Sequence, residues 1–98
     1  MPVETSRSIR EWGDAIFGAP KDLSVLVKRA RVEMDELEKA LREGDTEEAG
    51  REAADVVILL HRLAGILGHD LYEQVDAKMV INRARKWKAA GDGTGSHV

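Results

Sequence analysis

The chain has 98 residues, of which 43% are hydrophobic and 34% charged, with a formal net charge of −3 at pH 7 and no cysteine. This composition predicts one soluble domain, excludes disulfides and thiolate metal sites, and gives no reason to expect nucleic acid as a partner. No apolar run is long enough to predict a membrane partner, and the N-terminal residues lack the apolar core of a secretion signal. We therefore expect a cytoplasmic protein.

Glycine and proline residues divide the chain into four segments with helical periodicity. In chain order, helices are expected over about residues 6 or 8 to 17, 22 to 43, 46 to 67 and 70 to 87. The third and fourth begin with "DTEE" and "DLYE", an aspartate followed three residues later by a glutamate, which is typical of a helix cap. No segment alternates with period two. The sequence therefore predicts an all-α four-helix bundle over residues 1–90 and a glycine-rich tail over residues 91–98.

Two pairs of carboxylates lie at the borders of apolar helix faces. Glu33 and Glu36 belong to the second helix, and Glu52 and Asp55 to the third; the i, i+3 spacing puts both acids of a pair on one face. A short turn near Gly44 favours antiparallel packing of these helices, so the four acids would converge. An all-oxygen cluster suits a hard cation, Mg²⁺ or Mn²⁺, which would relieve the mutual repulsion. The same spacing also fits solvated acids that bind no ion.

A second apolar flank lies beyond the acids on each of these helices. Val25 and Val32 form it on the second helix, and Leu59 and Ile66 on the third. A single four-helix chain would leave one flank exposed, and large exposed apolar patches are rare on monomers. We therefore expect a homo-oligomer.

The acidic pattern resembles a family signature. Glu33-x-x-Glu36, fifteen residues, then Glu52-x-x-Asp55 is similar to the motif of the MazG-like all-α nucleoside triphosphate pyrophosphohydrolases. The segment "KMVINRARKW", residues 78–87, looks like the fourth-helix motif of that family, and "FGAPKDL", residues 17–23, is similar to its connection into the first acidic helix. Together these matches cover roughly residues 12–87.

The resemblance implies an enzyme that hydrolyses a nucleoside triphosphate, often a deoxy or non-standard one, to the monophosphate and pyrophosphate. It implies homodimers or homotetramers whose active sites involve neighbouring subunits. The cofactor would be Mg²⁺, with Mn²⁺ as an alternative, and Leu59 stands where family members often carry an aromatic residue. The resemblance implies four metal ligands, Glu33, Glu36, Glu52 and Asp55, of which Glu33 and Glu36 are also candidates for orienting the attacking water. It implies that Lys78, Asn82 and Arg85 bind the nucleotide.

Plainer interpretations remain for several of these residues. Trp12 and Trp87 are candidates for stacking on the base, but either could belong to the core or an interface. The basic residues of the fourth helix would also be favoured near a helix C-terminus by its dipole. His61 and His69 are expected at the surface.

Two other functions stay open. The segment "EAADVVILLHRL" is also similar to the acidic helix of phosphoribosyl-ATP pyrophosphohydrolases. A helical oligomer without catalytic activity would leave its acids solvated and its stability indifferent to Mg²⁺.

Overall fold

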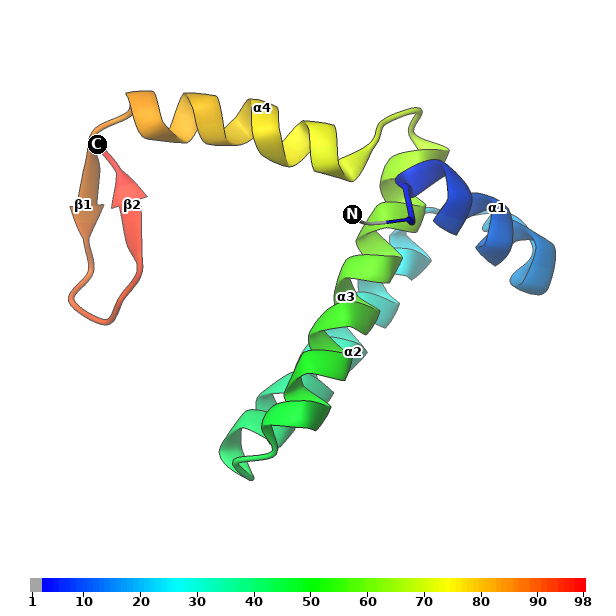
Figure 1. The fold of residues 1–98 in the computed structure, drawn as a ribbon, viewed down its shortest axis with the longest axis horizontal. Helices are drawn as coiled ribbons and strands as arrows, with labels where there is room; N and C mark the ends of the chain where they lie inside the picture. Colours follow the sequence, from blue (N-terminus) through cyan, green and yellow to red (C-terminus); the bar gives the residue numbers. More distant parts are fainter. Residues whose placement is uncertain (1–2) are drawn as a thin grey trace.

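The computed structural model describes residues 3–98, which form four helices and one β-hairpin (Figure 1). The helical fold class expected from the sequence is confirmed. Within the described residues, no helix combines the length and apolar character needed to cross a membrane. The elements are α1 (Ser6–Phe17), α2 (Ser24–Arg42), α3 (Thr46–Ile66), α4 (Leu71–Ala84), β1 (Trp87–Ala89) and β2 (Gly95–His97).

Helices α2 and α3 form an antiparallel hairpin that contains most of the core (Figure 1). Gly44 makes the turn between them with φ of 71°, a conformation that costs glycine little. Asp45 caps α3 by accepting a hydrogen bond from the Glu48 backbone N–H at 3.0 Å. The buried side chains between the two helices are mostly small, so the helices approach closely; they are Leu26, Ala30, Ala40, Ala49 and Ala64.

Helix α1 lies across the C-terminal half of α3, and a glycine makes the close approach feasible. A Cβ atom at Gly65 would lie 2.6 Å from the Ser6 carbonyl oxygen and 2.9 Å from Arg10 Cβ. No side chain fits there without moving the α1 backbone. Gly65 is therefore a packing position rather than a weak point of α3.

A buried polar junction joins α1, α3 and α4. Ser6 is fully buried, and its Oγ accepts the Leu71 N–H at 2.7 Å and lies 2.8 Å from His61 Nδ1. Because the hydroxyl oxygen has two lone pairs, it can accept from Leu71 and either donate to Nδ1 or accept from it, according to the His61 tautomer. The Ser6 N–H also donates to Asp70 Oδ1 at 3.1 Å. His61 is only 2% exposed, so the expectation that it lies at the surface was wrong.

Helix α4 departs from the rest of the fold. It leaves the end of α3, runs away from the α2–α3 hairpin and has no buried residue (Figure 1). It ends at Ala84 rather than at Trp87, and Arg85 is already extended. Strand β1 then pairs antiparallel with β2, with Trp87 opposite His97. Strands of three residues are too short to show a period-two pattern, which is why the sequence did not indicate this hairpin.

Candidate metal and nucleotide site

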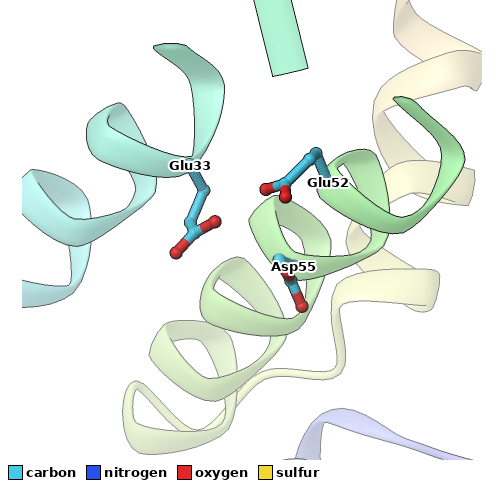
Figure 2. A group of neighbouring side chains, drawn as sticks. All are labelled: Glu33, Glu52 and Asp55. Carbon is cyan, nitrogen blue, oxygen red and sulfur yellow. The ribbon is translucent and has the colours of Figure 1, made fainter. Parts of the chain in front are cut away.

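Three carboxylates converge between α2 and α3. One oxygen each of Glu33, Glu52 and Asp55 lies within 4.8 Å of the others, with Glu33 projecting from α2 toward the two acids of α3 (Figure 2). Glu33 and Glu52 are half-buried and Asp55 is exposed. The antiparallel hairpin thus brings together three of the four acids that the sequence singled out.

Glu36 lies outside this group. It follows Glu33 by three residues on α2, which rotates it by about 60° around the helix axis, and its side chain is exposed. Its roles as metal ligand and water-orienting residue therefore stay predictions.

Glu48 is an acid that sequence reasoning missed. It precedes Glu52 by one turn of α3, and its Oε2 accepts hydrogen bonds from the Arg51 guanidinium at 2.8 and 3.2 Å. The "DTEE" cap pattern explained Glu48 locally and so concealed its i, i+4 relation to Glu52, the signal that could have identified it. Arg51 holds the pKa of the Glu48 carboxyl below its usual range.

Crowding changes the protonation of Glu52. A shared hydrogen bond with Glu48, another with Glu33, burial and repulsion from both carboxylates raise the pKa of Glu52 to about 7. When Glu52 is ionised, its buried Oε2 atom accepts no hydrogen bond, because the neighbouring carboxylates offer no donor. A buried, unsatisfied carboxylate oxygen among other carboxylates is costly unless a proton or a cation compensates it. The donor set is oxygen only, which suits a hard divalent cation. The residues present therefore fit such an ion.

An aromatic and apolar pocket of about 480 Å³ adjoins the carboxylates. Trp12 and Phe17 supply its aromatic side and meet edge to face, with ring centres 5.7 Å apart. Arg29, which pairs with Glu33 at 3.0 Å, lies at its charged side. The pocket combines a place for a flat ring with carboxylates at its edge; its lining comprises Trp12, Phe17, Val25, Leu26, Arg29, Glu33, Asp55, Ile58, Leu59 and Arg62.

A larger groove of about 920 Å³ lies between α1 and the α3–α4 connection. It contains none of the three converging carboxylates. Two of its arginines are already engaged by acids on α1, in the pairs Arg7–Glu11 at 3.0 Å and Arg10–Asp14 at 3.3 Å. The smaller pocket is therefore the better candidate site.

The basic residues of α4 are not brought to the carboxylates within one chain. The last turn of α3 lies about 16 Å along the helix from Asp55, and α4 begins beyond it and runs away (Figure 1). Asn82 Oδ1 is buried without a partner, and the Asn82 carbonyl accepts the Trp87 Nε1–H at 2.6 Å. The substrate-binding roles of Lys78, Asn82, Arg85 and Trp87 stay predictions, and they would require a second copy of the chain.

Comparisons with known proteins show which family the chain belongs to. No family model matches the chain. It is 49% identical over 47 residues to a dATP/dGTP diphosphohydrolase of Cyanophage S-2L, covering 48% of this chain and 45% of that protein. It is 34% identical over 96 residues to a dATP/dGTP diphosphohydrolase of Salmonella phage PMBT28, covering 98% of this chain and 31% of that protein. The match thus spans less than half the length of both curated relatives.

A solved structure matches over nearly the whole length of both chains. It is the Cyanophage S-2L MazG-like pyrophosphohydrolase bound to dGDP and three catalytic Mn²⁺ ions per active site. The sequence identity is 30%, the TM-score is 0.72, and the match covers 95% of this chain and 88% of that one. The resemblance first indicated by the spacing of four acids is thereby confirmed, and the chain belongs to the MazG-like pyrophosphohydrolase family.

Proposed function

We propose that this chain hydrolyses a deoxynucleoside triphosphate to the monophosphate and pyrophosphate with the help of a divalent cation. One observation carries the proposal: Glu33 and Asp55 belong both to the converging carboxylates and to the wall of the aromatic pocket. A nucleotide with its base in the pocket would therefore carry its phosphates toward the acidic group. The names of the relatives make dATP and dGTP the first substrates to test.

Each part of the site has a distinct task in this proposal. Glu33, Glu52 and Asp55 hold the cation, because carboxylates without it would repel a polyphosphate. The bound cation neutralises phosphate charge and lowers the pKa of a water molecule. Trp12 and Phe17 offer aromatic faces and edges to the base. Glu36, on the next turn of α2, orients the water that adds to the α-phosphorus while the α–β bond breaks and pyrophosphate leaves.

Mg²⁺ is the expected ion and Mn²⁺ the alternative. Both accept oxygen ligands in octahedral geometry, whereas Ca²⁺ is larger and takes more ligands in a looser arrangement. Ca²⁺ should therefore bind but support turnover poorly. The three Mn²⁺ ions in the similar structure belong to that protein, and they support testing Mn²⁺ here beside Mg²⁺.

We also propose that the active unit is a homodimer or homotetramer in the cytoplasm, without nucleic acid or membrane partners. The support is the state of α4: a 14-residue helix with no buried residue is marginal on its own in water. A second copy that covered α4 could place its Lys78, Asn82 and Arg85 near the phosphates. Arginine would then grip phosphate bidentately and lysine would act as a point charge.

The test is a product analysis. The pure protein is incubated with each common deoxynucleoside triphosphate, or with phosphoribosyl-ATP, in the presence of Mg²⁺ or Mn²⁺, and the products are separated by ion exchange. We expect monophosphate and pyrophosphate in equal amounts, with no diphosphate intermediate. Orthophosphate and diphosphate as first products would contradict the proposal. Turnover of phosphoribosyl-ATP alone would favour that enzyme class, and no turnover of any nucleotide would favour an oligomer without catalytic activity.

A further inference from the structure

Arg62 is a buried cation on α3 that binds the end of α1. The residue is only 9% exposed. Its Nη2 donates to the Gly18 carbonyl at 2.7 Å and to Asp14 Oδ1 at 3.2 Å. Its guanidinium carbon also lies 5.7 Å from the centre of the Phe17 ring, within cation–π range. One side chain thus contacts three residues in the last turn and cap of α1.

Gly13 provides the space that this side chain occupies. A Cβ atom at Gly13 would lie 2.5 Å from Arg62 Nε and 2.7 Å from Arg62 Cδ. Arg62 Nε is itself buried without a hydrogen-bond partner. Burying a charged group and leaving one of its donors unsatisfied is a poor way to gain stability. This arrangement therefore suggests a role in positioning.

The segment that Arg62 holds carries the aromatic side of the pocket. Trp12 is 57% exposed and Phe17 is 70% exposed, so the packing of their own rings does little to fix this end of α1. The helix ends at Phe17, and the φ of 80° at its cap residue Gly18 reverses the chain toward α2. The carbonyl of that same residue is the one that Arg62 binds at 2.7 Å. Arg62 thus joins the end of α1 that carries the exposed aromatic pair to the α2–α3 hairpin that carries Glu33 and Asp55.

We propose that Arg62 is a positioning residue for the nucleoside: it holds Trp12 and Phe17 at a fixed place beside the carboxylates and thereby sets the affinity for the base. The inference rests on the proposed function, since it takes the pocket as the nucleoside site. Both hydrogen bonds leave Nη2, at the far end of the guanidinium, while the planar group also lies within cation–π range of the Phe17 ring. A lysine ammonium keeps the charge and has three donors, but it is compact and ends about one bond short of Nη2, so it cannot reach both acceptors and also lie beside the Phe17 ring.

The central experiment compares Arg62→Lys with Arg7→Lys. Arg7 is the control because its side chain is 87% exposed and makes only a helix-surface pair with Glu11. For Arg62→Lys we expect KM for the best deoxynucleoside triphosphate to rise about tenfold, with kcat within about twofold of wild type and the Mn²⁺ activation midpoint unchanged. Arg7→Lys should match wild type in all three. Unchanged KM in Arg62→Lys would overturn the proposal, and so would a loss confined to kcat or to the Mn²⁺ midpoint.

A binding measurement separates this inference from catalysis. In a Trp87→Phe background Trp12 is the sole indole, so its fluorescence reports on the pocket. Titration with the deoxynucleoside monophosphates should quench Trp12 fluorescence in the Trp87→Phe protein that retains Arg62. Adding Arg62→Lys should raise the dissociation constant of the monophosphate about tenfold. Equal binding by the two proteins would overturn the proposal.

Two further outcomes are decided in advance. If Arg62→Lys does not fold, Asp14→Asn is tested instead. This change removes the charge of one acceptor of Arg62 and leaves the Gly18 carbonyl in place. We then expect a smaller rise in KM, and an unchanged KM would overturn the proposal. If the wild-type protein hydrolyses no nucleotide, the proposed function fails by itself. The Trp12 titration then decides alone whether Arg62 positions the pocket.

Discussion

The α2–α3 hairpin and the segment from α4 to β2 differ in how far one chain completes them. The hairpin contains most of the buried side chains and all three converging carboxylates. The α4 segment has no buried residue, although Val75, Met79, Val80 and Ile81 are exposed apolar side chains on it. A single chain therefore explains why the acids meet, but it does not explain what covers α4.

The same two regions also carry different functional groups: carboxylates in the hairpin and basic side chains in the α4 segment. The acids and the aromatic pocket can be assembled from α1, α2 and α3 alone. Of the basic residues that the family motif assigns to the phosphates, Lys78 lies on α4 and Arg85 directly follows it, and α4 leads away from the acids (Figure 1). If both sets act on one substrate, contacts between chains must complete the site.

The largest effect is expected in the hairpin. Asp55→Asn is nearly isosteric, so the fold should survive, but the loss of one ligand charge should lower turnover by at least about a hundredfold, or roughly 2.7 kcal/mol in the barrier. Steady-state assays with Mn²⁺ and Mg²⁺ measure this, and circular dichroism checks the fold. Glu38→Gln is the control, since Glu38 is exposed and pairs only with Arg42 on the helix surface. Retention of more than about a tenth of wild-type activity would show that Asp55 is not a metal ligand.

Substitutions on α4 should change the oligomeric state of the protein. Val75→Asp together with Met79→Asp places two charges one turn apart on an exposed apolar side of α4. We expect sedimentation to show a smaller species than wild type, because charges buried at an interface without partners are strongly unfavourable. Activity should fall with the assembly if α4 serves a neighbouring copy. Asp76→Asn, on the same helix, should leave the mass unchanged. A wild-type protein that is monomeric at micromolar concentration would remove the basis for a composite site.

The junction between the two regions should show an intermediate effect on stability. Ser6→Ala removes the hydroxyl that accepts from the Leu71 N–H and bonds His61 Nδ1. A buried ring nitrogen and a partly buried backbone N–H then lose their partner, and we expect the free energy of unfolding to fall by about 1–3 kcal/mol. Denaturant unfolding monitored by circular dichroism measures it. Ser24→Ala, at an exposed position at the start of α2, is the matched control and should change little. A small effect at Ser6 would mean that the junction does not fix the start of α4.

The smallest effect is a pH dependence confined to the hairpin. The folded, metal-free protein raises the pKa of Glu52 from 4.5 to about 7, so protonated Glu52 favours the folded state. Its contribution to stability is present below about pH 4.5 and is lost as pH rises to about 7. The melting temperature of the metal-free protein should therefore fall by a few degrees over this range, and Glu52→Gln should flatten the decline.

A divalent cation should reverse that trend. It competes with protons for Glu52, so its binding strengthens as pH rises and stabilises the folded state more at pH 8 than at pH 6. The same measurements on the Val75→Asp, Met79→Asp variant should show the same slope if the effect belongs to α2 and α3. An identical slope in Glu52→Gln and wild type would assign the titration to another group.

The sequence by itself determined the helices, their order and the identity of most of the acids. Helical periodicity and glycine breakers are local signals, and the i, i+3 spacing places Glu33 and Glu36, or Glu52 and Asp55, on one face whatever the rest of the chain does. The turn at Gly44 made their convergence predictable, because a short turn between long helices leaves antiparallel packing as the simple solution.

Only the tertiary structure decided which groups meet and which do not. It included Glu48 among the acids that crowd Glu52 and left Glu36 outside the group, since rotation about a helix axis relative to a neighbour depends on packing rather than on spacing. It buried His61 and Arg62, which a helical pattern cannot distinguish from surface residues when their partners, Ser6 and Gly18, lie more than forty residues away. It also showed that α4 ends at Ala84 and that two three-residue strands pair, because such pairing joins segments that are not related by a local sequence pattern.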